Sequence, residues 1–253
     1  MRKLDYQAEI DRISAFLRDY SAHSGFGRYI IGVSGGIDSA LSAALAVQAL
    51  GSERVIGVLL PYRDSHPDST AHGRLLCQTL GIQTLLVDIS PMVDAYFEQL
   101  EPDADPLRRG NFMARMRMSV LFDLSAKHSA LVVGTSNQSE LMTGYFTQYG
   151  DSAAAIEPIG QLYKTEVWEM ARHLNIPECI INKAPTADLW QDQTDEAEMG
   201  IEYRILDAIL YAIKQGSSLD SFAPEKVKKV QELIRRSEFK RLNPPMPEAP
   251  CSI

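Results

Sequence analysis

Cysteine is scarce in this chain, and long apolar runs are missing from it. The 253 residues include only Cys77, Cys179 and Cys251, which lie far apart and form no CxxC pair, so a zinc site or a disulfide framework is not expected. No apolar stretch approaches the roughly 20 residues that a membrane span needs. Residues 1–20 are charged throughout and lack the apolar core of a signal peptide. These absences predict a cytoplasmic protein with reduced thiols and no membrane partner.

A surplus of positive charge is missing as well. The chain has 25 Lys and Arg against 33 Asp and Glu, a formal net charge of −8. Nucleic-acid partners require a basic surface that neutralises phosphates, so we expect none here. A nucleotide needs only a local positive site and stays possible. No low-complexity linker divides the chain, so we expect a single domain over residues 1–253 with a Pro-rich, irregular tail over residues 243–253.

Short apolar runs alternate with helical patterns in the first half of the chain. We expect strands over Tyr29–Val33, Val55–Leu60, Ile82–Val87 and Leu131–Val133, and helices over Ile10–Tyr20, Ala40–Leu50, Ser69–Leu80 and Asn111–Lys127. The second half is mostly helical, with helices over Thr165–Leu174, Glu196–Ile213 and Pro224–Arg236. The pattern predicts an α/β fold, a doubly wound and mostly parallel sheet with helices on both faces. In such a fold ligands bind at the carboxyl ends of the strands.

Two polar segments, Pro61–Asp68 and Asp188–Glu198, interrupt this pattern. Both are candidates for lids over a site at the strand ends. Composition alone supports the alternative of ordinary surface loops equally well.

The most informative local pattern is GVSGGIDS at residues 32–39, which joins an expected strand to the start of an expected helix. Its adjacent glycines allow the backbone to bend tightly and approach a ligand. Free amides at the helix start form an anion site, to which Ser34 and Ser39 can add hydroxyl donors. The loop is neither a Walker A motif nor a dinucleotide GxGxxG motif. A purely structural alternative is a glycine-rich turn with Asp38 placed to favour the helix dipole.

The pattern VGTSNQSE at residues 133–140 also follows an expected strand and opens a helix. Asn137 and Glu140 have capping-box spacing, so Glu140 could simply cap that helix. The functional alternative is that Glu140 and Asp38 converge on Mg²⁺, which prefers such hard oxygen ligands together with ATP phosphates. Spacing alone does not separate the two interpretations.

The loop at residues 32–39 resembles the SGGxDS loop of the PP-loop ATP pyrophosphatases, and the chain from Gly32 to about Pro245 resembles the ammonia-dependent NAD synthetases of that class. The matching segments, besides residues 32–39 and 132–140, are GN at 110–111, ARMRM at 114–118, TGYFTQYGD at 143–151, YK at 163–164, KAPTADLW at 183–190 and QTDE at 193–196. The resemblance implies an adenine nucleotide alpha hydrolase-like fold of the PP-loop type and an ATP-dependent ligase that forms an amide bond. Such an enzyme adenylates the carboxylate of deamido-NAD, releases pyrophosphate, and then uses ammonia to form NAD and AMP.

The resemblance also implies roles for individual residues. Asp38 and Glu140 would hold Mg²⁺, and Asp38 and Lys164 would be catalytic. ATP would be bound by Gly32, Val33, Ser34, Gly35, Gly36, Ile37, Asp38, Ser39, Thr135, Lys164 and Thr186, and the acceptor by Arg115, Gln148, Ala155, Phe239 and Lys240. Without the resemblance, Lys164 and Arg115 could equally be solvated helix charges, and Thr135 and Thr186 turn hydroxyls. The family further implies a homodimer. We expect no glutaminase domain beside the synthetase domain, so ammonia would come from solution or another protein.

Three positions depart from the family, all on the acceptor side. Gln148 stands where the family usually has Lys, Ala155 where it has Asp, and Phe239 where it has His before Lys240. Each lost polar contact is worth about 1–3 kcal/mol. The departures fit either drift among NAD synthetases or an amidating ligase for another carboxylate, such as nicotinate mononucleotide. A non-catalytic nucleotide sensor is a further alternative, which Asp38, Glu140 and Lys164 argue against, because a sensor need not keep metal ligands.

Overall fold

A parallel sheet of four strands forms the centre of the computed structural model, which describes residues 2–186 and 194–247. The strands are β1 (Tyr29–Gly32), β2 (Val55–Leu59), β3 (Gln83–Leu86) and β4 (Leu131–Val133), in the spatial order β3-β2-β1-β4. Strand β1 pairs in parallel with β2 on one side and with β4 on the other. The strand order therefore reverses between β1 and β4, which is the position where open α/β sheets bind ligands.

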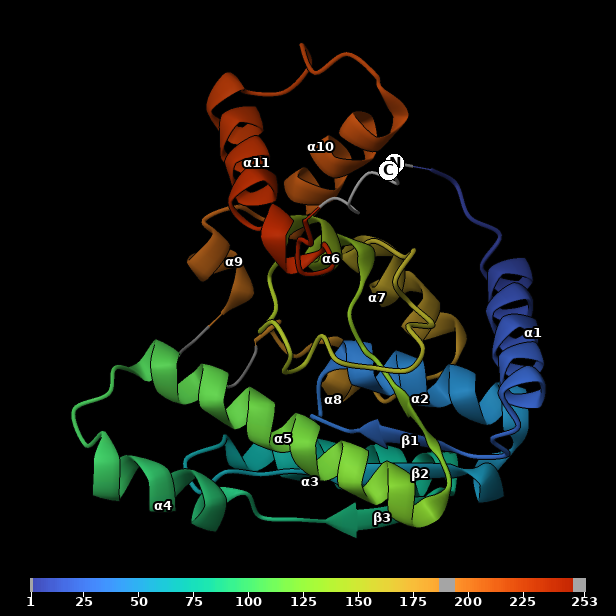
Figure 1. Ribbon diagram of the computed structural model, residues 1–253. Coiled ribbons are helices and arrows are strands. Elements are labelled where there is room, and N and C mark those ends of the chain that lie inside the picture. The colour runs from blue at the N-terminus through green and yellow to red at the C-terminus, as the bar shows by residue number, and fades with distance from the viewer. Residues whose placement is uncertain (1, 187–193, 248–253) are drawn as a thin grey trace, which may run out of the picture.

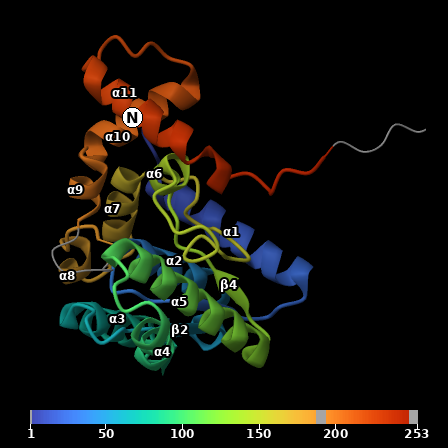
Figure 2. The same cartoon turned by 60° about the vertical axis from the view of Figure 1, so that its left-hand side comes forward.

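Helices cover both faces of this sheet, as the alternation of strands and helices predicted (Figures 1 and 2). On one face, Tyr29 and Ile31 of β1 share a buried cluster with residues of α1 (Tyr6–Ser24), α2 (Ile37–Leu50) and α3 (Pro67–Leu80). On the other face, Ile30 packs with residues of α4 (Ser90–Leu100) and α5 (Pro106–His128). Successive strand residues point to opposite faces, so a fully apolar strand is what a sheet buried on both sides requires.

A second group of helices follows β4 in the sequence. It comprises α6 (Gln138–Thr143), α7 (Lys164–His173), α8 (Glu178–Ile181), α9 (Asp195–Met199), α10 (Tyr203–Gln215) and α11 (Pro224–Arg236). Leu206, Ile209 and Leu210 of α10 form a third buried cluster with Val230 of α11. Figure 1 shows α10 and α11 at the top of the molecule, with α7 between them and the sheet layer, and α7 contacts both α2 and α10.

Several boundaries differ from those expected, for local reasons. The expected helix over 196–213 is two helices, α9 and α10, because Gly200 ends α9 in the left-handed region at φ 64°. The expected helix over 111–127 starts earlier, at Pro106, because the Asp105 side chain caps it by accepting a hydrogen bond from the Arg108 N–H.

The two polar segments that were expected to be loops, 61–68 and 188–198, are partly helical. The first turn of α3 already starts within the segment 61–68. Of the segment 188–198, residues 188–193 lie outside the described residues, and Asp195–Glu198 belong to α9, so the loop interpretation was wrong for that part. Helices α4 and α8 were not anticipated. The described part of the tail, residues 243–247, is irregular as expected. Within the described ranges, no helix is both long and apolar enough to cross a bilayer.

Candidate functional site

A cavity of about 480 Å³ opens at the carboxyl ends of β1, β2 and β4. Its walls come from segments that are far apart in the sequence, including the loop after β1, the loop after β4, the start of α7 and residues 183–186. All the residues predicted to bind ATP line this cavity except Gly35. The fold therefore brings together the ATP side of the site that the motifs indicated.

The loop at residues 32–39 is shaped to present amides to the cavity. Gly35 adopts φ 76°, and a Cβ there would lie 2.2 Å from the Ser69 carbonyl oxygen, so the loop fits tightly against the first turn of α3. The Ser39 hydroxyl accepts a hydrogen bond from the Ser34 N–H (3.2 Å) and donates one to the Gly36 carbonyl (3.0 Å). Gly36 precedes α2 and provides no side-chain cap. The first amides of α2 are thus left to bind an anion, as helix N-termini do.

A group of charged side chains occupies the centre of the cavity wall. The Lys164 ammonium lies 2.5 Å from an Asp38 carboxylate oxygen and 3.2 Å from Glu140 Oε1. The Asn137 amide donates a hydrogen bond to the other Asp38 oxygen (2.8 Å). One cation position is therefore shared by the two predicted metal ligands. This donor set fits Mg²⁺, which binds proteins through one or two carboxylates and takes its other ligands from phosphates and water.

Both interpretations of Glu140 are compatible with this geometry. Its backbone N–H donates to the Asn137 side chain, and its Oε2 accepts from the Asn137 N–H, which completes a capping box for α6. Its Oε1 accepts a hydrogen bond from the Lys164 ammonium (3.2 Å). Burial raises the pKa of Glu140 to about 8, Asp38 adds to that shift and Lys164 opposes it. A cation bound beside Glu140 would favour its charged form.

Lys164 is a buried side chain, only 2% exposed, and so it is not a solvated helix charge. Burial lowers the pKa of its ammonium, but the Asp38 and Glu140 carboxylates outweigh burial and leave that pKa raised. The ammonium also lies 5.2 Å from the centre of the Tyr203 ring. Lys164 is therefore a fixed positive charge at the point where α6, α7 and the loop at 32–39 meet.

Sequence reasoning did not identify three residues that belong to the cavity or to its charged centre. The Lys183 ammonium lines the cavity and donates to the Ser69 hydroxyl (2.8 Å), above the loop at 32–39. Asp195 lines the cavity too, and the Tyr203 hydroxyl donates to it (3.0 Å). Asn137 was considered only as a helix cap. All three lie in the sequence segments that match the family, and that was the available signal.

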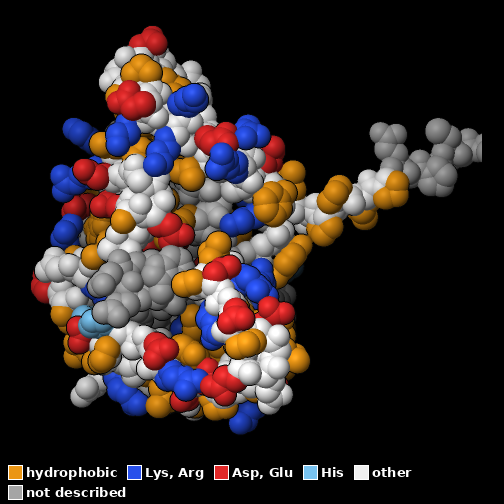
Figure 3. All heavy atoms as spheres, turned by 90° about the vertical axis from the view of Figure 1, so that its left-hand side faces the viewer, with side chains coloured by type: hydrophobic (Ala, Val, Ile, Leu, Met, Phe, Trp, Pro, Cys, Tyr) orange, Lys and Arg blue, Asp and Glu red, His pale blue; other side chains and the backbone are white. Residues whose placement is uncertain are grey.

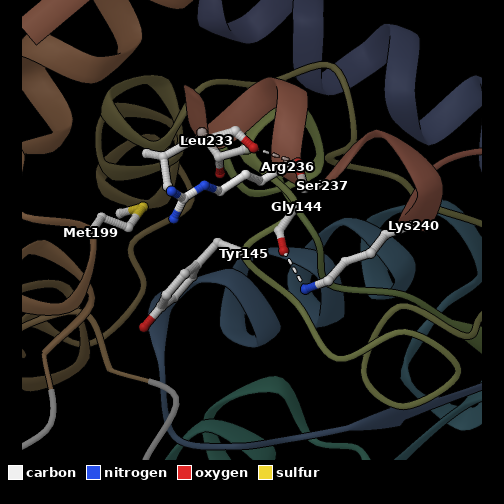
Figure 4. A pocket seen from close by; sticks show the side chains of 8 residues that line it. Gly144, Tyr145, Met199, Leu233, Arg236, Ser237 and Lys240 are labelled. Atoms are coloured by element: carbon white, nitrogen blue, oxygen red, sulfur yellow. Dashed lines mark hydrogen bonds between the residues drawn. The ribbon is translucent and has the colours of Figure 1, made fainter. Parts of the chain in front are cut away.

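The acceptor side contrasts with this ordered centre. Of the five residues predicted to bind the acceptor, only Lys240 lines the large cavity. Its ammonium donates to the carbonyls of Gly144 (2.9 Å) and Phe146 (2.8 Å). Figure 4 shows Lys240 reaching Gly144 at the edge of a second, smaller cavity of about 250 Å³, whose wall includes Tyr145 and Arg236. Lys240 and Tyr145 line both cavities, which are therefore neighbours.

The other predicted acceptor residues lie away from the large cavity. Arg115 is exposed and donates through Nε to the Gln148 carbonyl (3.3 Å). Ala155 donates its N–H to the Val132 carbonyl, next to β4. Phe239 is 63% exposed. One chain thus gathers the residues predicted to bind ATP in one cavity, whereas the residues predicted to bind the acceptor are scattered.

Comparison with known proteins decides the family. The sequence model of the NAD synthase family matches residues 9–244. An NH(3)-dependent NAD(+) synthetase of Fusobacterium nucleatum is 44% identical over 252 residues, which cover 96% of this chain and 97% of that protein. The chain belongs to the NAD synthase family. It is therefore an ATP-dependent ligase that forms an amide bond, as the resemblance implied.

Solved structures support membership in the NAD synthase family and show that the fold is shared. The NH3-dependent NAD synthetase of Campylobacter jejuni, in complex with the nitrate ion, matches with a TM-score of 0.85 at 33% identity, over 97% of this chain and 100% of that chain. The NMN synthetase of Francisella tularensis matches with a TM-score of 0.90 at 30% identity, over 98% of this chain and 100% of that chain.

Proposed function

We propose that this NAD synthase family member makes NAD from deamido-NAD, ATP and free ammonia. The observation that carries the proposal is the meeting of Asp38, Glu140 and Lys164 beside the loop at residues 32–39, in one cavity of a chain of this family. An enzyme that releases pyrophosphate must stabilise several negative charges on the leaving group, and amides, an ammonium and a metal-binding carboxylate pair are the groups that do so.

The first step is adenylation. A carboxylate oxygen of deamido-NAD forms a bond to the α-phosphorus of ATP, and the bond from that phosphorus to the bridging oxygen of pyrophosphate breaks. The amides of the loop at 32–39 and the start of α2 would hold the phosphates, and Lys183, above that loop, would donate to the departing pyrophosphate. Thr135, Lys164 and Thr186 line the same cavity and would contact ATP.

Asp38 and Glu140 would hold Mg²⁺, which supplies charge neutralisation to the phosphates when bound. The two carboxylates face one cation position, now taken by the Lys164 ammonium. Lys164 would then donate to a phosphate oxygen close by. Among the residues that the structure describes, no group of three or more His, Cys, Asp or Glu side chains forms a metal site, so the remaining ligands would come from phosphates and water.

The second step is amidation. Ammonia attacks the carbonyl carbon of the acyl adenylate, the carbon–oxygen bond to AMP breaks, and the nitrogen loses a proton to give the amide. The acceptor would lie toward Lys240 and Tyr145, where the two cavities adjoin. The alternative acceptor, nicotinate mononucleotide, is not favoured, because the Fusobacterium nucleatum relative named for NAD synthesis is 44% identical and the Francisella tularensis NMN synthetase 30%.

A homodimer would complete the acceptor side. Arg115 and Phe239 are exposed and lie outside the cavity. Residues of a site that two subunits share would be exposed in this way in a single subunit. Figure 3 shows hydrophobic side chains along the C-terminal segment that projects from the body, and Leu242 and Met246 there are exposed by 62% and 84%. A second copy of this chain is the partner that would bury them. We expect this enzyme to act in the cytoplasm.

The test is product formation from Mg²⁺-ATP and ammonium with deamido-NAD and nicotinate mononucleotide in separate reactions. The proposal predicts equal amounts of NAD, AMP and pyrophosphate with deamido-NAD and little turnover with the mononucleotide. Turnover with the mononucleotide alone would reject the proposed acceptor and keep the ligase chemistry. Light scattering on the same protein tests the dimer, and a stable species of 28.1 kDa would reject it.

A further inference from the structure

Behind the charged centre lies a buried carboxylate, Asp207 of α10, which has no contact with the cavity. It is fully buried and its two oxygens bind two different helices. Oδ1 accepts a hydrogen bond from the Ser139 hydroxyl of α6 (2.5 Å). Oδ2 accepts from both the N–H and the hydroxyl of Thr165 in α7, each at 2.8 Å. A single side chain therefore joins the first turns of α6 and α7.

The residues next to these partners are the ones that face the cavity. Ser139 precedes Glu140, and Thr165 follows Lys164. The Ser139 hydroxyl, while donating to Asp207, also accepts a hydrogen bond from the Lys164 backbone N–H (3.0 Å). Two links thus set the spacing between Glu140 and Lys164: the direct bond from Lys164 to Ser139, and the path from Ser139 through Asp207 to Thr165. Buried charge-assisted bonds such as those of Asp207 hold geometry firmly.

The same face of α10 also supports the other end of Lys164. Tyr203 and Asp207 are four residues apart, so they lie one turn from each other on one side of the helix. The Tyr203 ring lies 5.2 Å from the Lys164 ammonium, and its hydroxyl donates to Asp195. Helix α10 therefore supports Lys164 at two points. Asp207 reaches the Lys164 backbone indirectly, through Ser139, and the Tyr203 ring lies beside the Lys164 ammonium.

We propose that Asp207 is a positioning residue of the ligase reaction, which holds Lys164 and Glu140 at the separation that the ATP site requires. It lines neither cavity and acts through Ser139 and Thr165. The inference rests on the proposed function of Asp38, Glu140 and Lys164. A purely stabilising role for Asp207 is the competing account, since the residue also satisfies amides at the start of α7.

Glu166 offers a matched control at the same helix start. It is 3% exposed, accepts a hydrogen bond from the Tyr163 N–H (2.9 Å), and pairs with Arg2. Its contacts reach neither α6 nor the cavity side of Lys164. Asp207→Asn leaves a single acceptor oxygen for the three hydrogen bonds from Ser139 and Thr165, and so weakens the joint between α6 and α7. Glu166→Gln alters the start of α7 alone.

The experiment compares the two variants with the parent protein in melting temperature, Mg²⁺-ATP affinity by calorimetry and steady-state kinetics well below the melting temperature. Asp207→Asn should lower kcat by about 10²-fold, the scale of a displacement of roughly 1 Å in a catalytic group. It should weaken Mg²⁺-ATP binding by about tenfold, which is about 1.4 kcal/mol, and leave the KM for deamido-NAD unchanged. Glu166→Gln should lower only the melting temperature.

Equal kcat values in folded Asp207→Asn and Glu166→Gln would overturn the inference and leave Asp207 a stabilising residue. If Asp207→Asn fails to fold, Thr165→Val removes the hydroxyl that donates to Asp207 and leaves the bond between Ser139 and Lys164 intact. A fall in its kcat that Thr165→Ser restores supports the inference, and an unchanged kcat rejects it. A parent protein that binds Mg²⁺-ATP but does not use deamido-NAD would reject the proposed function alone. In that case the Mg²⁺-ATP affinities of the two variants still decide the role of Asp207.

Discussion

The residues proposed to bind ATP (the ATP side) and those proposed to bind the acceptor (the acceptor side) are arranged in different ways. On the ATP side, Asp38, Glu140 and Lys164 come from three elements and meet within hydrogen-bonding distance. On the acceptor side, Arg115, Ala155 and Phe239 lie outside the cavity. The three departures from the family pattern also fall on the acceptor side. A site held by buried, mutually dependent contacts tolerates few changes, whereas positions outside such a network can change one at a time.

The largest effect should come from the two carboxylates that are proposed to hold Mg²⁺. Asp38→Asn removes a charge that faces the shared cation position and should lower turnover by about 10³-fold, the scale of losing one preorganised electrostatic group. Steady-state AMP release measures it, with Asp220→Asn, an exposed change in the segment between α10 and α11, as the control. A near-normal rate in Asp38→Asn would show that Asp38 does not hold the metal. The contrast between the ATP side and the acceptor side would then not hold.

The next largest effect should come from changing the backbone conformation of the loop at residues 32–39. Gly35→Ala places a Cβ 2.2 Å from the Ser69 carbonyl oxygen and forces φ 76° on alanine. The free energy of unfolding should fall by about 1–3 kcal/mol. Gly36→Ala is the matched control, because its Cβ would meet only the Ser34 hydroxyl at 3.3 Å. Equal stability losses in urea titrations of the two variants would show that the loop is not constrained at Gly35.

A smaller effect is expected at Lys183, at the edge of the ATP side. Lys183→Met should raise the KM for ATP and weaken inhibition by pyrophosphate by about tenfold, since one charge-assisted hydrogen bond is lost. The KM for deamido-NAD should stay the same. Lys228→Met, an exposed lysine of α11, serves as the control. Unchanged pyrophosphate inhibition in Lys183→Met would place this lysine outside the phosphate site.

The smallest effect should come from the acceptor side. Gln148→Lys combined with Ala155→Asp restores the side chains that the family usually has and should change the KM for deamido-NAD by only about threefold if the departures are drift. A gain in kcat/KM of about a hundredfold or more would instead show that the acceptor side had been altered for another carboxylate. The measurement is the ratio of kcat/KM values for deamido-NAD and nicotinate mononucleotide in the double variant and the parent.

The sequence predicted most of the fold, because apolar runs buried on both faces and glycine stops are local signals. It did not predict the break at Gly200, since residues 196–213 are almost all compatible with one helix and the left-handed turn depends on local hydrogen bonds. The motif at residues 32–39 predicted a tight backbone bend there. Spacing alone left the convergence of Asp38 and Glu140 open, and only the family resemblance implied that the two carboxylates meet, as they do at Lys164. Asp207 could not be found in this way, because its role depends on contacts with Ser139 and Thr165, which are 68 and 42 residues away in the sequence.

The central claim is that the ATP side activates a carboxylate by adenylation, and an isotope experiment tests it most directly. Deamido-NAD carrying oxygen-18 in both carboxylate positions is converted with Mg²⁺-ATP and ammonium, and the AMP is analysed by mass spectrometry. The account predicts that each AMP contains one oxygen-18 atom, because the carboxylate oxygen that attacks phosphorus leaves with it. AMP without the label, or ADP and phosphate as products, would contradict the account.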